Sequence, residues 1–145
     1  MIIKDTTMLF RNELESYPVN VAQLNKLMLQ LEEIESKLYD VSAIQYDKEL
    51  GATNDQAQME LLKLDLIERK DKLEMLIGIF RVKVLYIDSI LDKIPEDDKI
   101  LLQKHFFEGQ SYAKLAEEYH YSERNMRYKV DKVLNFAYQQ RIKVL

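Results

Sequence analysis

The chain has 145 residues and a formal net charge of −4, and with 47% apolar residues it is long enough to bury the core of one domain. Its three glycines and two prolines are too few for the many tight turns of a β-sandwich or barrel, so long helices are expected. Its lack of cysteine excludes disulfides, thiolate metal sites and cysteine nucleophiles, and no uncharged run approaches the roughly 18 residues that a membrane span requires.

The first 16 residues predict a short helix rather than a signal peptide. Charges from Lys4 to Glu15 interrupt the uncharged apolar stretch that a signal peptide needs. A proline pushes the residue before it out of the α-helical region, so we expect the helix to end before Pro18, with a break at residues 16–18.

A long helix is predicted from about Val19 to Tyr46. Its apolar residues follow steps of three and four, which is the heptad pattern of a coiled coil. They are Leu24, Leu27, Leu31, Ile34, Leu38 and Val41. This stripe is expected to pack against a second helix.

A second long helix is predicted from about Asn54 to Asp92, after a break that contains Gly51. The apolar positions of its heptad pattern are Met59, Leu62, Leu66, Leu73, Leu76, Phe80, Ile87 and Ile90. Arg69 and Lys83 fill two further positions of this pattern; if each long helix instead pairs with a copy in another chain, a partner chain or the flanking helices would supply carboxylates that face them. Ile77, Val84 and Leu91 form a second apolar stripe in the C-terminal half of this helix. That half is therefore expected to pack against two neighbouring parts of the structure, and the N-terminal half against one helix.

Joined by a short loop, the two long helices predict an antiparallel coiled-coil hairpin within residues 1–93. The alternative is that each helix pairs with a copy in another chain. We expect a homodimer that forms through this hairpin region.

Residues 94–145 predict a domain of three shorter helices. The first spans about Glu96–Phe107 after Pro95, the second Ser111–Tyr119, and the third begins at Ser122, with a serine N-cap on each of the last two. Two helices, a short turn and a third capped helix are the layout of a helix-turn-helix. The inward side of the third helix is expected to consist of Met126, Val130, Val133 and Leu134.

The charge of the chain is uneven. From Ser122 to Leu145 six basic residues stand against two acidic ones, a net charge of +4, whereas the rest of the chain holds 15 basic and 23 acidic residues, a net charge of −8. A basic end on an acidic body favours a polyanion partner at that end.

On a helical wheel the four inward residues of the third helix lie on one side, and the opposite side is polar. That face consists of Arg124, Asn125, Tyr128, Asp131 and Lys132, with Arg127 and Lys129 on its flanks. Arg pairs with guanine and Asn with adenine, so Arg124 and Asn125 are the candidate base-reading residues. Tyr128 suits a thymine methyl or a phosphate. Arg127, Lys129 and Lys132 suit phosphates.

The starts of the second and third helices supply the other candidates for DNA binding. The backbone N–H groups that follow Ser111 and Ser122 are expected to bind phosphates. Glu123 suits a cytosine amino group or the positive end of the helix. Tyr112 and Lys114, in the first helical turn after Ser111, are the remaining candidate DNA-binding residues.

Three segments of this domain resemble region 4 of bacterial sigma-70-type factors. They are Ile94–Leu102, Phe106–Glu118 and Tyr121–Arg127, which read IPEDDKILL, FFEGQSYAKLAEE and YSERNMR. The resemblance implies a helix-turn-helix that reads an upstream promoter element and touches RNA polymerase. In the sigma pattern the groove residues fall on Glu123, Arg124, Arg127 and Tyr128, whereas the wheel places more weight on Asn125 and Lys132.

The whole layout, an acidic helical hairpin before such a domain, is similar to phage regulators of the ArpU/RinA late-transcription type. Since no stretch resembles sigma region 2, the kinship implies an activator or a sigma-domain mimic rather than a complete sigma factor.

The sequence therefore predicts an all-α, cytoplasmic, phage or prophage DNA-binding transcription regulator with double-stranded DNA and RNA polymerase as partners. No enzymatic activity, cofactor, metal or membrane contact is expected, since the glycines are isolated and the chain has only two histidines. Two alternatives stay open: a DNA-packaging subunit similar to a small terminase, and a coiled-coil adaptor that binds proteins only.

Overall fold

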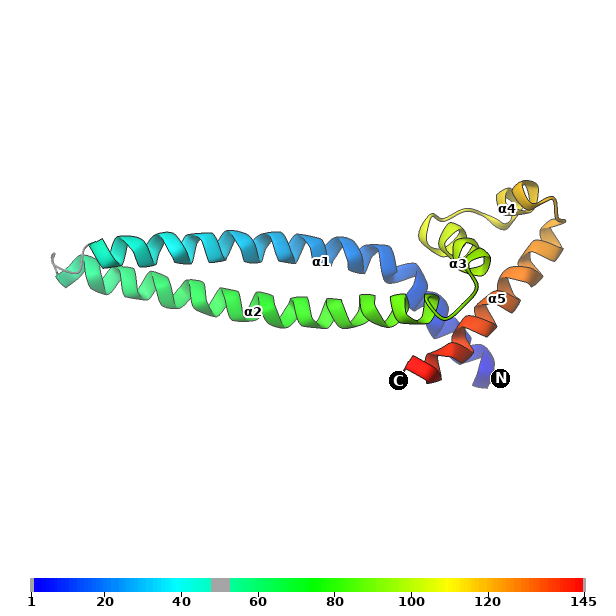
Figure 1. Ribbon diagram of the computed structural model, residues 1–145, viewed down its shortest axis with the longest axis horizontal. Helices are drawn as coiled ribbons and strands as arrows, with labels where there is room; N and C mark the ends of the chain where they lie inside the picture. The colour runs from blue at the N-terminus through cyan, green and yellow to red at the C-terminus, as the bar shows by residue number, and fades with distance from the viewer. Residues whose placement is uncertain (1, 48–52, 145) are drawn as a thin grey trace. The chain divides into compact units, whose positions relative to one another are not determined.

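The structure, a computed structural model, describes residues 2–47 and 53–144. Within these ranges every regular element is a helix, which confirms the all-α prediction (Figure 1). The elements are α1 (Ile2–Asp47), α2 (Thr53–Leu91), α3 (Glu96–Leu102), a π-helical turn η1 (Gln103–Phe107), α4 (Tyr112–Tyr119) and α5 (Glu123–Val144). None of the described helices is long and apolar enough to cross a membrane.

Packing divides the chain into two compact units, one of residues 21–81 and one of residues 1–20 with 82–145. This division differs from the boundary expected between residues 93 and 94. Residues 21–81, which hold the C-terminal part of α1 and most of α2, form one unit. The N-terminal part of α1 and the C-terminal end of α2 belong to the unit that holds α3, α4 and α5.

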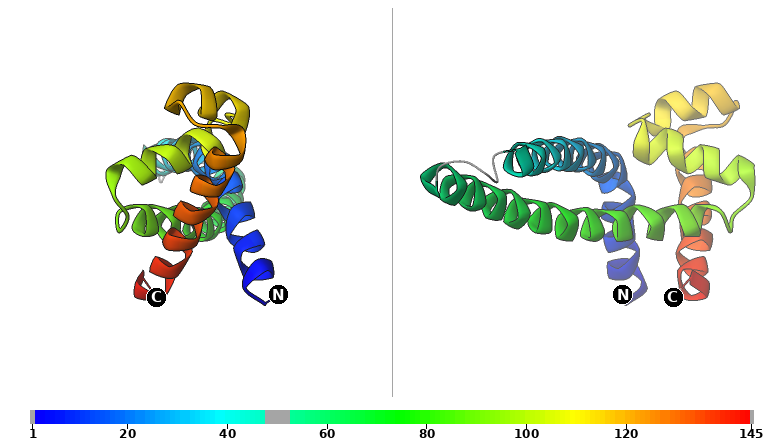
Figure 2. Two further views of the ribbon diagram at one scale, coloured as in Figure 1. Left: turned by 90° about the vertical axis from the view of Figure 1, so that its right-hand side faces the viewer. Right: turned by 60° about the vertical axis from the view of Figure 1, so that its left-hand side comes forward.

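In the unit of residues 21–81, α1 and α2 lie side by side in opposite directions, as Figures 1 and 2 both show. The predicted stripe of α1 faces inward: Leu27 and Val41 are buried, and its other members are half-buried. The antiparallel hairpin predicted from the heptads is therefore confirmed.

On α2 the predicted register was wrong in part. The inward positions are Met59, Lys63, Leu66, Lys70, Leu73 and Ile77, all of them buried or half-buried. Leu62 and Leu76 remain 46% and 41% exposed. After Met59 the observed inward positions follow steps of four and then three residues, whereas the prediction used three and then four. Lys63 and Lys70 also occupy inward positions, which the prediction reserved for apolar residues. The long apolar part of a lysine side chain can lie inward while its ammonium group reaches water.

Arg69 and Lys83 consequently do not occupy inward positions. Both side chains are exposed, and Arg69 pairs with Asp65 one turn earlier in its own helix, at 3.1 Å.

In the other unit one core joins segments that are far apart in the sequence. Phe10 and Leu14 of α1 pack with Ile87, Ile90 and Leu91 of α2. The remaining members of this core come from the last third of the chain: Ile94, Leu101, Leu102, Phe106, Leu115, Ala116, Met126, Val130, Val133, Leu134 and Ala137. The four residues predicted to face inward from α5 are all buried here.

The break expected before Pro18 does not occur, because α1 continues through that residue. A proline inside a helix removes one backbone hydrogen bond, and the packing of nearby side chains can offset that loss. Before Pro18, Leu14 is fully buried, and Tyr17 stacks on Phe107 with ring centroids 4.5 Å apart. Tertiary contacts therefore override the local signal.

The first helix of the predicted domain begins at Glu96 and ends at Phe107, as expected, but its last turn is π-helical. Glu108 donates its backbone N–H to the carbonyl of Gln103 at 3.0 Å, a bond that spans five residues. Gly109 then turns the chain at φ 71° toward α4.

Candidate nucleic-acid interface

Serine side chains cap the two helices that form the interface. The Oγ of Ser111 accepts a hydrogen bond from the backbone N–H of Lys114 at 3.1 Å, and the Oγ of Ser122 accepts one from Asn125 at 3.1 Å. Both predicted caps are confirmed. They fix where α4 and α5 begin and thus which residues of α5 face outward.

The turn between these helices is held by backbone geometry. His120 ends α4 in the left-handed conformation at φ 58° and ψ 41°. The N–H of Tyr121 donates to the carbonyl of Ala116 at 2.9 Å. Histidine is among the side chains that tolerate positive φ better than most, so the connection is short without a glycine.

One side of α5 anchors the helix and the other side is open. Met126, Val130, Val133 and Leu134 are buried with at most 6% of their surface exposed. On the opposite side Arg124, Asn125, Tyr128 and Lys132 are exposed, and Tyr128 keeps 73% of its surface accessible. From Arg124 to Lys132 this open face is about 12 Å long, which is within the width of a DNA major groove. The views agree that α4 and α3 lie near the start of α5 (Figures 1 and 2).

Three of the predicted residues bind one another at the edge of the open face. Arg127 forms an ion pair with Glu123 at 3.8 Å, and its guanidinium lies over the ring of Tyr112, 5.0 Å from the centroid. Tyr112 is half-buried and stacks on His105 at 4.4 Å. Tyr112 therefore ties α4 to α5. Its ring is less accessible than the prediction assumed.

Asp131 was placed on the outer face, and the structure corrects this. Its carboxylate pairs with the guanidinium of Arg11, which reaches across from α1. Arg11 also donates to the hydroxyl of Tyr112 at 3.5 Å. Burial alone would lower the pKa of Arg11, but its bonds to Tyr112 and the charge of Asp131 raise it. The wheel could not show this because 120 residues separate the partners.

A groove of about 530 Å³ follows the open face of α5. Three of the predicted residues line it, namely Tyr128, Lys129 and Lys132. The other lining residues are Pro95, Asp98, Tyr121, Val133 and Phe136, so the groove contains one carboxylate beside its two ammonium groups. Lys129 is half-buried, with its ammonium 5.5 Å from the centroid of the Tyr121 ring. Aromatic rings beside ammonium groups can contact bases and phosphates at the same time.

Sequence reasoning missed Tyr121 and Phe136 as part of this surface. Tyr128 and Phe136 are eight residues apart, which places them on one side of α5, whereas Tyr121 lies in the turn before that helix. The spacing could have identified Phe136, but no helical periodicity could have identified Tyr121. No local signal could have identified Arg11.

The other predicted residues at the start of α4 are exposed. Ser111 and Lys114 face solvent, and the hydroxyl of Ser111 is engaged by its own cap. His105 is half-buried beside Tyr112, and His120 lies in the turn after α4. In the described part of the chain, no group of three or more His, Asp or Glu side chains gathers in a way that could hold a metal.

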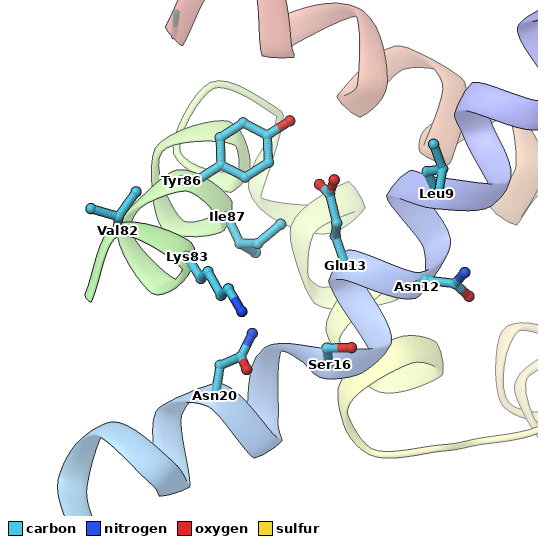
Figure 3. A pocket seen from close by; sticks show the side chains of 9 residues that line it. All are labelled: Leu9, Asn12, Glu13, Ser16, Asn20, Val82, Lys83, Tyr86 and Ile87. Carbon is cyan, nitrogen blue, oxygen red and sulfur yellow. The ribbon is translucent and has the colours of Figure 1, made fainter. Parts of the chain in front are cut away.

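A second groove, of about 490 Å³, lies between the ends of α1 and α2 that belong to this unit (Figure 3). Leu9, Val82 and Ile87 line it together with polar residues, and Figure 3 shows the carboxylate of Glu13 and the ring of Tyr86 on neighbouring walls. Burial is the main cause that raises the pKa of both groups. None of the predicted DNA-binding residues lines this groove.

Comparison with known proteins gives no relative: no family model, curated protein or solved structure matches this chain.

Proposed function

We propose that the protein is a sequence-specific DNA-binding transcription regulator that places α5 in the major groove. The resemblance of residues 94–127 to sigma region 4 supports this proposal and adds contact with RNA polymerase. The similarity in layout to phage late-transcription regulators supports an origin in a phage or prophage.

One observation carries the proposal: the side of α5 that holds Arg124, Asn125, Tyr128 and Lys132 is open, while the opposite side is packed into the core. A helix that served only to pack into the core would not require side chains suited to base reading on its exposed side. Arg and Asn at the helix start match the side chains that pair with guanine and adenine. Lys132, about two turns further along, and Lys129 would bind phosphates on either side of the groove.

The charge distribution supports the same orientation. The body of the chain is acidic, so it repels DNA except at the basic C-terminal segment. Contact with a duplex is thereby restricted to the surface that α5 presents. A single recognition helix reads few base pairs, so useful specificity requires a second copy or a polymerase partner.

Selection of bound duplexes from a random pool tests the proposal. We expect the full-length protein to enrich one short motif, and its affinity for that motif to fall as salt rises, since phosphate contacts release counterions. Enrichment should be repeated with Arg124→Ala, which keeps the cap at Ser122 and the buried face intact.

Two outcomes would contradict the proposal. The first is a wild-type protein that binds no duplex at low salt, which would favour an adaptor that contacts proteins only. The second is binding that enriches no motif, which would remove sequence-specific regulation and leave only non-specific DNA binding.

A further inference from the structure

Helix α2 carries apolar side chains on two opposite sides within residues 56–81. Leu66, Leu73 and Ile77 face α1 and are buried or half-buried. On the other side Leu61, Leu64, Met75 and Ile79 keep 68%, 59%, 67% and 47% of their surface exposed. A helix that is apolar on both sides is normally covered on both. The hairpin covers only one of them.

The exposed side follows helical steps from Leu61 to Ile79, and we name it the outer stripe: Leu61, Leu64, Glu68, Asp71, Lys72, Met75 and Ile79. All seven side chains are exposed. Its two ends are apolar and its middle is charged. Exposed apolar residues gathered in this way mark an interaction site more often than scattered ones do.

The outer stripe is nearly symmetric about residue 70. Leu61 and Ile79 lie nine residues to either side of that point, Leu64 and Met75 lie six and five residues away, and Glu68 and Lys72 lie two residues away. A stripe with this order can match a reversed copy of itself. In that match apolar residues meet apolar residues and a carboxylate meets an ammonium group.

We propose that the outer stripe binds a second copy of this chain, with the two α2 helices antiparallel about a twofold axis near residue 70. In a twofold interface each contact occurs twice. Leu61 then packs against the partner's Ile79, Leu64 against the partner's Met75, and Glu68 faces the partner's Lys72.

Charge selects this orientation over a parallel one. In a parallel pair Glu68, Asp71 and Lys72 would each face the same residue of the partner, so three pairs of like charges would lie at the centre of the interface. Like charges at facing positions of paired helices select against that pairing. The antiparallel pair replaces the repulsion at Glu68 and Lys72 with two attractive contacts between these residues, while the two Asp71 side chains remain near the axis.

Cysteine cross-linking tests both the surface and the orientation, because the natural chain has no cysteine. Leu64→Cys and Met75→Cys are made as separate full-length proteins. In the proposed pair residue 64 lies opposite residue 75, whereas two copies of residue 64 are about 16 Å apart along the helices, too far for a disulfide. Under mild oxidation we expect the mixture of the two variants to form a covalent dimer, and each variant alone to stay largely monomeric on a non-reducing gel.

A covalent dimer from each variant alone, with no further gain on mixing, would mean a parallel pair and overturn the proposal. No covalent dimer in any sample would also overturn it.

Sedimentation equilibrium tests the interface without cysteine. We expect Met75→Glu to raise the dissociation constant of the dimer at least about tenfold, since it places a charge among apolar side chains. The matched control is Leu29→Glu on α1, where the wild-type side chain is 66% exposed and lies outside the outer stripe. It should leave the dissociation constant unchanged. A wild-type protein that remains monomeric at about 100 μM would contradict the proposal.

Charge reversal gives a third readout. Glu68→Lys and Lys72→Glu should each weaken the dimer, and the double variant should restore it, since the attractive contact is re-formed with the signs exchanged. Failure of the double variant to recover would overturn the antiparallel pairing. These measurements involve no DNA, so their outcome is separate from that of the proposed function.

Discussion

Arg124 and Lys132 lie at opposite ends of the same open face, and their chemistry suits them to different tasks. A guanidinium can make two hydrogen bonds to one guanine, whereas an ammonium group at the end of a flexible stem acts as a point charge toward phosphate. Both side chains are exposed. Their substitution should therefore change specificity and general affinity separately.

We expect Arg124→Ala to lose about 1–3 kcal/mol of discrimination between the selected site and a scrambled duplex. Lys132→Ala should weaken binding to both duplexes about equally and reduce the slope of affinity against salt by about one. Fluorescence anisotropy at several salt concentrations measures both effects. Lys26→Ala, which removes a charge from an exposed position of α1, is the control and should change neither quantity. Unchanged discrimination by the Arg124 variant would remove Arg124 from base reading.

Individual residues of α5 show what a sequence pattern can predict and what it cannot. The inward set on α5 and the two serine caps could be predicted because they depend on spacing and on bonds within four residues. Asp131 satisfied the same helical wheel as Lys132, yet it pairs with Arg11 of α1. No local pattern holds that information.

At the scale of elements, Tyr17 joins α1, α2 and η1. Its hydroxyl donates to the carboxylate of Asp88 on α2, and its ring stacks on Phe107 of η1. Burial, followed by the bond to Asp88 and the charges of Asp88 and Asp92, raises the pKa of Tyr17 from 10.0 to about 12. The proton is held more tightly in the folded state than in the unfolded one.

That pKa difference predicts how stability depends on pH. The contribution of Tyr17 should be complete below pH 10 and lost as pH rises from 10 to about 12. Tyr17→Phe keeps the stacked ring but removes the bond, so at pH 8 we expect it to lower the free energy of unfolding by about 1 kcal/mol, a value that allows for partial exposure to solvent. Urea unfolding from about pH 8 to 11 should show the gap between wild type and variant narrowing above pH 10. A gap that stays constant over this range would contradict the assigned pKa.

Pro18 illustrates the same balance between local and tertiary effects. The local rule predicted the end of a helix there, and α1 continues. The neighbours Leu14 and Tyr17 are both packed against the core of the unit. The helix continues because the burial of these side chains, in the turn before the proline, outweighs the loss of one hydrogen bond.

At the scale of the whole molecule, the N-terminal part of α1 completes the core of the unit that contains α4 and α5. Phe10 and Leu14 are almost completely buried in the same core as Leu115, Met126 and Leu134. We therefore expect residues 94–145 alone to lack a cooperative unfolding transition, because the removal of α1 and α2 exposes one whole side of that core. Circular dichroism and urea titration of this fragment, with the full chain as control, measure the effect. A fragment that unfolds as sharply as the full chain would show that the contacts of Phe10 and Leu14 are dispensable.

The number of chains in the assembly separates the proposed regulator from the DNA-packaging alternative. The antiparallel pairing that we propose for α2 is a closed twofold contact, which would limit the assembly to two copies. A packaging ring requires a different, head-to-tail contact and would give about eight or more copies by light scattering.

The sequence by itself determined the helical class, the antiparallel hairpin, the two serine caps and the side of α5 that is buried. These features depend on periodicity and on hydrogen bonds between near neighbours, which a linear pattern records. Only the tertiary structure decided the register of α2, the continuity of α1 through Pro18, and the pairing of Arg11 with Asp131. Each of these depends on which distant side chains supply burial or opposite charge, and that is settled when the helices pack.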